Sequence, residues 1–307
     1  MLESHYDVPV AFIIFNRPDV TKRVFSEIAK QRPKRLFIIA DGARAHREGE
    51  ADRVAVTRAI TENVDWPCEV LRNYAEDNMG CKRRVASGIT WVFEHVDRAV
   101  ILEDDCLPAA AFFSFCRDML TKYKSNGLVF SISGSNFGSG DAERGHYFSR
   151  YALMWGWATW RDRWQKYEIE PVDYKRVLAR TWWRRPIVFA YWLMVSRSVM
   201  SGALDTWDIQ WILTVWRNRG LACRPSQNLV ENLGFGAEAT HTRDANSQLA
   251  QLRVAVDVED LTTPLSSVAA SVRRDRVDEE RWALINIRSI LLMRFPWIGV
   301  IKKALGQ

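Results

Sequence analysis

The 307-residue sequence has no long hydrophobic run. No apolar stretch reaches the ~18–20 residues that cross a bilayer, so we expect no membrane-spanning helix. Residues 1–10 mix polar and apolar side chains, including His5 and Asp7, which is not the pattern of a signal peptide. Repeats and low-complexity segments are also missing. With 48% apolar residues, the chain can form a sizeable core.

Cysteine is scarce and scattered. The five residues are Cys68, Cys81, Cys106, Cys116 and Cys223, an odd number without any C-x-x-C pair. This spacing indicates neither a zinc site nor a disulfide framework. We therefore expect a reducing compartment, and so a cytoplasmic protein.

Positive charge is in mild excess. The formal net charge is +6 and the pI is about 9.1. Such a balance suits anionic partners, which include phosphate groups, nucleic acid and acidic membrane surfaces. The basic residues are spread along the chain and no helix-turn-helix or strand-aromatic pattern is present, so we expect no nucleic-acid partner.

Apolar runs alternate with helical patterns through the first half of the chain. The predicted strands are 8–15, 36–40, 69–72, 99–102 and 128–133, and the predicted helices are 18–30, 47–62, 81–95 and 108–123. Continuous apolar runs are typical of strands covered on both faces. The order predicts an α/β fold with a doubly wound, mainly parallel sheet flanked by helices.

Three acidic residues follow one of these buried strands. The apolar run 100–102 leads directly into Glu103, Asp104 and Asp105. Clustered carboxylates repel one another and lose hydration, so such a cluster favours a bound cation. Oxygen ligands suit Mg²⁺ or Mn²⁺, and either ion can also hold a diphosphate. The alternative is a solvated acidic turn.

Other polar residues follow the first two predicted strands, namely Asn16, Arg17 and Asp41. Ligands of doubly wound sheets bind beyond the carboxyl ends of the strands, so these side chains and the acidic triplet are expected to line one crevice. Lys82 and Arg83 begin a predicted helix, where they would either contact a diphosphate or form a solvated basic turn.

Composition changes in the second half. Ten of the fourteen tryptophans lie between Trp155 and Trp216. We interpret most of them as a second core layer and some as an aromatic platform for a sugar ring. The predicted organisation is a domain over 1–245, with a nucleotide-sugar-binding half (1–135) and an acceptor-side half (136–245).

A polar linker and a tail follow, over 246–307. The stretch 281–307 is basic and apolar and has no acidic residue. It is either an interfacial segment attracted to anionic lipid, on the inner face of the cell membrane, or a C-terminal helix docked on the domain.

Five segments in order carry a family resemblance. VILEDDCLPAAAFFSFC, VAFIIFNRPDV, FIIADGA, YALMWGWATWRDRW and TWDIQWILTVWRNRGLACRPSQNLVENLGFG resemble GT-A fold glycosyltransferases, most closely the inverting N-acetylglucosaminyltransferase I family. The chain is also similar to bacterial glycosyltransferase-like proteins with a Gly-Phe-Gly…Ala-Thr-His ending. The resemblance covers about 8–242.

The resemblance implies roles for the residues at the strand ends. Asp105 would bind the metal that bridges the diphosphate. Asp104 would hydrogen-bond the ribose, and Glu103 would contact the donor sugar. Asp41 would accept the uracil imide hydrogen, with Arg17 near the base and phosphate.

It also implies a general base for an inverting displacement. Asp208 would take the proton from the acceptor hydroxyl, but the acids here are spaced differently from those of the family, so Asp205 is the alternative. Trp157 and Trp207 would contact substrate. His241 would complete the metal shell or lie on the surface.

The implied activity is a metal-dependent, inverting transfer from a UDP-sugar, with N-acetylglucosamine as the leading sugar. The acceptor would be a saccharide or lipid-linked saccharide in bacterial surface polysaccharide synthesis. One alternative is a sugar nucleotidyltransferase, although residues 15–18 lack the glycines of a phosphate loop. Another is a carbohydrate- or membrane-binding protein with a degenerate site.

Overall fold

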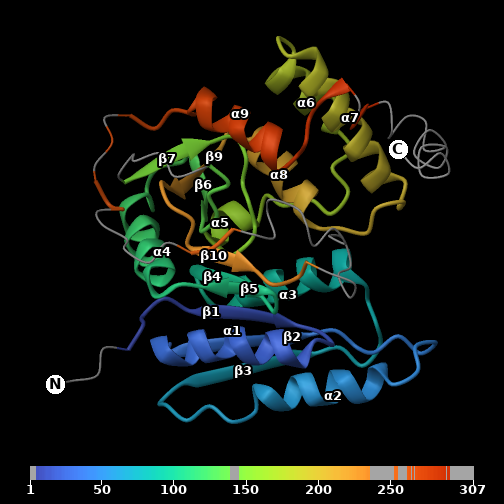
Figure 1. Cartoon of the computed structure of the whole chain (residues 1–307), viewed down its shortest axis with the longest axis vertical. Helices are drawn as coiled ribbons and strands as arrows, with labels where there is room; N and C mark the ends of the chain where they lie inside the picture. The colour runs from blue at the N-terminus through green and yellow to red at the C-terminus, as the bar shows by residue number, and fades with distance from the viewer. Residues whose placement is uncertain are drawn as a thin grey trace.

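The structure is a computed structural model that describes residues 5–138, 145–235, 252–254, 261–263, 265, 267–287 and 289–290. An eight-stranded sheet has the order β3-β2-β1-β4-β8-β6-β9-β7, and β10 pairs with β5 (Figure 1). The strands are β1 (Val10–Ile14), β2 (Arg35–Ala40), β3 (Glu69–Tyr74), β4 (Arg98–Glu103), β5 (Cys106–Pro108), β6 (Val129–Ser133), β7 (His146–Ser149), β8 (Trp157–Trp160), β9 (Leu221–Pro225) and β10 (Val230–Asn232). The helices are α1 (Pro18–Gln31), α2 (Glu50–Ile60), α3 (Cys81–His95), α4 (Ala110–Lys122), α5 (Arg161–Trp164), α6 (Tyr174–Trp182), α7 (Pro186–Met200), α8 (Asp208–Arg217) and α9 (Val272–Arg281).

The first half of the sheet is parallel. β1 pairs in parallel with β2 and β4, and β2 pairs in parallel with β3. Every residue of β1 is buried, because one face shares a core with α1 and α4 and the other with α3. Parallel pairing brings the carboxyl ends of β1, β2 and β4 to one edge of the sheet.

The second half mixes directions. β8 is antiparallel to both β4 and β6, β6 is parallel to β9, and β7 is antiparallel to β9. The predicted fold class is confirmed as an α/β fold with a mainly parallel sheet flanked by helices. The stretch 157–160 is a strand that is not among those predicted from the sequence. Gly156, with a φ of 63°, makes the turn, and the four residues that follow enter the sheet as β8.

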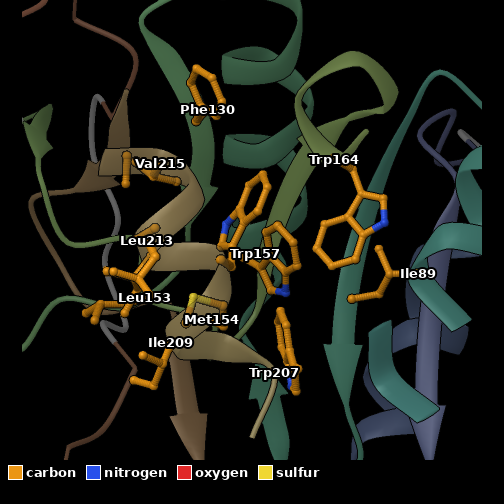
Figure 2. Packing of buried hydrophobic residues seen from close by; sticks show 14 of the residues in the cluster. Ile89, Phe130, Leu153, Met154, Trp157, Trp164, Trp207, Ile209, Leu213 and Val215 are labelled. Atoms are coloured by element: carbon orange, nitrogen blue, oxygen red, sulfur yellow. The ribbon is translucent and has the colours of Figure 1, made fainter. Parts of the chain in front are cut away.

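Most tryptophans of the second half are core residues, as predicted. Eight of the ten between Trp155 and Trp216 are buried. Figure 2 shows Trp157, Trp164 and Trp207 packed together beside α8. The Trp157 and Trp207 rings are stacked, with centroids 5.6 Å apart. This layer holds the start of α8 against the sheet.

Helix α9 attaches through charged groups. Its Asp275 and Asp278 are buried, and they pair with Arg150 and with the fully buried Arg224. The helix therefore packs tightly on β7 and β9, although it lies in the stretch predicted to follow the main domain. No helix among the described residues is both long and apolar enough to cross a bilayer. Residues 291–307 of the predicted tail lie outside the described residues.

Candidate functional site

A cavity of about 800 Å³ opens at the carboxyl ends of the parallel strands. Segments from several parts of the chain line it, among them 13–17 at the end of β1, 103–106 at the end of β4, 153–155 before β8, and 204–209 at the start of α8. Sequence reasoning predicted that the residues after the strands would share one crevice. The structure brings together Arg17, Asp41, Glu103, Asp104, Asp105, Asp205, Trp207 and Asp208.

Arg17 bridges two members of the acidic triplet. Its guanidinium donates to Asp104 Oδ1 at 2.7 Å and to Asp105 Oδ2 at 3.1 Å. Asp104 also accepts a bond from the Phe15 amide at 3.2 Å. Burial raises the pKa of Asp104 to about 6, although Arg17 and the Phe15 amide lower it. Arg17, which follows β1, thus forms ion pairs inside the cavity with Asp104 and Asp105, which follow β4.

Glu103 faces the cavity without such a partner. No hydrogen bond to its carboxylate is present among the described residues. Burial raises its pKa well above the usual range, and the nearby charges of Asp105, Asp104 and Asp208 raise it further. A cation or a hydrogen-bond donor entering here would relieve this repulsion.

Asp208 lies at the first position of α8. Its Oδ1 accepts hydrogen bonds from Thr206 Oγ1 and from the Ile209 amide. Its Oδ2 has no partner among the described residues. Asp208 and Glu103 both line the cavity. Asp208 therefore lines the cavity with a free acceptor, as a general base requires.

Asp205 has a different role. Its Oδ2 accepts from the Cys81 amide at 3.1 Å and its Oδ1 accepts from the Lys82 amide at 3.3 Å. The N-cap residue of α3 is Gly80, with a φ of 78° and no side chain to cap the helix. Asp205 supplies that cap from 124 residues away, in favourable interaction with the helix dipole.

Asp41 is also fully engaged. Its Oδ1 accepts from the amides of Gly42 and Met79, both at 2.9 Å. Its Oδ2 accepts from Gly80 N and Asn78 Nδ2, both at 3.1 Å. Since a carboxylate has about four acceptor positions, none is left for a uracil imide. This geometry differs from the role implied by the resemblance: Asp41 orders the turn that precedes α3.

Two cations that the sequence reasoning missed line the cavity. Arg44 pairs with the buried Glu50 and its guanidinium lies 5.6 Å from the centre of the Phe15 ring. Arg53, on α2, is exposed and has no acidic partner among the described residues. Both residues follow β2 along the chain. The sequence of α2 has the polar composition of a surface helix, so it does not indicate that Arg53 contacts the cavity.

The predicted phosphate contacts Lys82 and Arg83 do not line the cavity. Arg83 is exposed elsewhere on α3, and Lys82 meets the site only through its amide. Arg84 lines the cavity but is committed to main-chain oxygens of Ala40 and Asn73.

Several residues that line the cavity are aromatic or apolar. Trp155, Trp207 and Trp282 line it, together with Phe137 and Met154. Trp157, predicted to contact substrate, does not, because its side chain is completely buried beneath Trp207. Of the three tryptophans that line the cavity, Trp207 is buried, whereas Trp155 and Trp282 are half-buried, and Trp282 directly follows α9.

The carboxylates suit a divalent ion only in part. No group of three or more His, Cys, Asp or Glu side chains in the described part of the chain is arranged to hold a metal. Mg²⁺ commonly takes one or two carboxylates, several waters and substrate phosphates, and Asp105 at the cavity edge fits that requirement. His241, the other predicted ligand, lies outside the described residues.

Close backbone approach supports the placement of Asp105. A Cβ on Gly234 would lie 2.2 Å from Asp105 Oδ2, so a larger residue there would force that carboxylate to move. The Asp105 carbonyl also accepts from the Leu233 amide at 2.7 Å. The segment after β10 therefore shapes the space around this carboxylate.

Comparison with known proteins finds no matching family model and no matching curated protein. One similar solved structure is a galactosyltransferase, LgtC, in complex with donor and acceptor sugar analogs, with 12% identity, a TM-score of 0.38, and coverage of 91% of this chain and 97% of that one. Another is a UDP-glucose pyrophosphorylase complexed with UDP-glucose (10% identity, TM-score 0.28, coverage 51% and 78%). A third is 4-diphosphocytidyl-2C-methyl-D-erythritol synthase from Anaerococcus prevotii (8% identity, TM-score 0.32, coverage 52% and 76%). With likenesses this distant, the functional proposal comes from the side chains of the cavity.

Proposed function

We propose that this chain is a metal-dependent, inverting glycosyltransferase that takes its sugar from a nucleoside-diphosphate-sugar. One observation carries the proposal: Asp208 lines the same cavity as Glu103, Asp104 and Asp105, and its Oδ2 has no hydrogen-bond partner among the described residues. An inverting displacement needs one base on the acceptor side and stabilisation of a leaving diphosphate on the other.

The polar half of the cavity suits the donor. Arg53 and Arg44 provide positive charge at its rim, and Phe15 provides a partly exposed ring for a base. Bound beside Asp105, Mg²⁺ or Mn²⁺ would neutralise charge on the leaving diphosphate. Arg17 holds Asp104 and Asp105 in place for this role.

The aromatic half suits the acceptor. Tryptophan faces pack well against the C–H faces of sugar rings, and the half-buried Trp155 and Trp282 line the cavity. Asp208 lines the same cavity, so an acceptor hydroxyl beside it could pass its proton to Asp208 Oδ2 as its oxygen attacks the anomeric carbon. The new glycosidic bond forms as the bond to the diphosphate breaks.

The donor base is proposed to be uracil, and the sugar N-acetylglucosamine, from the sequence resemblance alone. Asp41 does not support the choice of base, because its acceptor positions are filled. The same resemblance suggests a saccharide or lipid-linked saccharide acceptor of bacterial surface polysaccharide synthesis.

A sugar nucleotidyltransferase is the competing activity. It would need a phosphate-binding loop after β1, but residues 15–18 contain no glycine and Arg17 is engaged by carboxylates. The products separate the two activities. Incubation with UDP-sugars and mixed saccharide acceptors should release UDP, whereas formation of a UDP-sugar and pyrophosphate from UTP and a sugar phosphate would contradict the proposal.

A further inference from the structure

The segment 174–204 combines six cations with no acidic residue. It forms α6, a short turn and α7, and it lies away from β1–β3 (Figure 1). Two of its cations are used within the fold: Arg185 pairs with Glu279, and Arg180 donates to main-chain carbonyls. The other four are exposed and have no acidic partner among the described residues: Lys175, Arg176, Arg184 and Arg197.

Exposed apolar side chains lie among these cations. Trp183 is 71% exposed and Ile187 is 44% exposed, although large apolar residues are normally covered. Positions 175, 176, 179 and 183 fall on one side of a helix, so Trp183 continues the cationic side of α6. The Arg184 guanidinium lies 5.3 Å from the centre of the Trp183 ring.

We propose that this surface, the α6–α7 face (Lys175, Arg176, Ala179, Trp183, Arg184 and Ile187), docks on an anionic lipid bilayer. Cations with an exposed tryptophan and aliphatic side chain match a bilayer interface, where headgroups are anionic and the layer below is apolar. A second copy of the chain, docked through the same face, would place its cations against those of the first copy. The stretch 281–307 is itself basic, so it is no better a partner.

Docking would also orient the cavity. Helix α7 has 15 residues, or roughly 22 Å of length, and the chain after it supplies the cavity residues from Leu204 to Ile209. A bilayer at the α6–α7 face would thus hold the acceptor wall within a few tens of ångströms of the headgroups. This consequence for a lipid-linked acceptor rests on the proposed function, whereas the docking itself does not.

Sedimentation of the full chain with vesicles tests the docking. The chain should bind vesicles of phosphatidylcholine mixed with phosphatidylserine more tightly than vesicles of phosphatidylcholine alone. Lys175→Gln/Arg176→Gln should weaken the binding on the order of twentyfold, at roughly fivefold for each cation. The matched control Lys22→Gln/Arg23→Gln removes two exposed cations of α1 and should leave binding unchanged.

Trp183→Ser, compared with Val56→Ser on α2, tests the apolar contribution separately. Both side chains are exposed, so neither variant should impair folding. Equal binding to both vesicle types would overturn the proposal, as would loss of binding only with Lys302→Gln/Lys303→Gln. Binding of a labelled oligonucleotide that Lys175→Gln/Arg176→Gln abolishes, without vesicle binding, would reassign the surface to nucleic acid. Vesicle binding needs no nucleotide or sugar, so its outcome is independent of the proposed activity.

Discussion

Two aspartates three positions apart perform separate tasks in this structure. Asp205 uses both oxygens on amides of α3, whereas Asp208 lines the cavity and has one oxygen without a partner in the described part of the chain. Sequence spacing left the choice of base open between them. Hydrogen-bond geometry favours Asp208, because a base must have a free acceptor to receive a proton.

Asp208→Asn should lower transfer by about 10²–10⁴-fold while leaving nucleotide affinity nearly unchanged. The amide keeps the size of the side chain and the bond to Thr206, but it cannot take a proton. Release of nucleoside diphosphate from sugar nucleotide in the presence of acceptor measures the rate, and calorimetry measures the affinity.

Asp205→Ala is the matched comparison, and it should act mainly on stability. Loss of the cap at the start of α3 should cost about 0.5–2 kcal/mol of unfolding free energy in urea. If Asp205→Ala abolished transfer while Asp208→Asn did not, the roles of the two aspartates would be reversed.

Gly234 makes room for Asp105. In Gly234→Ala the new methyl would lie 2.2 Å from Asp105 Oδ2, so the carboxylate must move. We expect metal-dependent nucleotide binding to weaken at least about tenfold, as is usual when a supporting contact of a metal ligand is lost. Gly127→Ala, where nothing lies within 4 Å, is the control for calorimetry. Unchanged binding in Gly234→Ala would show that Asp105 is not the ligand.

At the scale of elements, α9 is unusual because its buried side is charged. Burial raises the pKa of Asp278 from 3.8 to about 6, despite the neighbouring Arg224. The loss of hydration therefore outweighs the attraction within the ion pair. The helix carries Trp282 to the cavity, so its attachment also bears on the acceptor wall.

The attachment of α9 should depend on pH. A folded pKa above the unfolded value means that the native state holds the proton more tightly, so this contribution is complete below about pH 3.8 and is lost as pH rises through 6. Between pH 4 and 7 the stability of the wild type should fall relative to Asp278→Asn, by about 1–3 kcal/mol. Urea unfolding at several pH values measures the difference, with the exposed Asp65→Asn as control. Parallel pH curves for wild type and Asp278→Asn would contradict this account.

The elements that the sequence predicts well are those with a strong local pattern. The apolar runs of β1, β2 and β4 and the helical period of α3 identified those elements to within a few residues. Strand β8 was missed, because Trp157 to Trp160 are buried on both faces and form too short a run to indicate a strand. The sequence does not predict that α9 packs on the sheet, because its buried carboxylates give it the composition of an exposed helix.

At the scale of the whole molecule, the strand ends explain how distant residues could be placed together from the sequence. Arg17 and the acidic triplet follow strands that pair directly, so the topology alone brings them together. The sequence does not show where each side chain points or which of its hydrogen-bond acceptors are already in use. Asp41 already accepts four hydrogen bonds, and Trp157 is buried beneath Trp207. Arg53 lines the cavity from a helix whose sequence has no distinguishing pattern.

The most direct test of the account is calorimetric titration of the chain with UDP, GDP and CMP, with and without Mn²⁺. The proposed site predicts binding of a nucleoside diphosphate that requires Mn²⁺, is lost in Asp105→Ala, and persists in the exposed control Asp65→Ala. UDP is the diphosphate expected to bind, and tight GDP binding would keep the site while changing the donor base. Absence of nucleotide binding under every condition would contradict the glycosyltransferase proposal and leave a carbohydrate-binding protein without catalytic function.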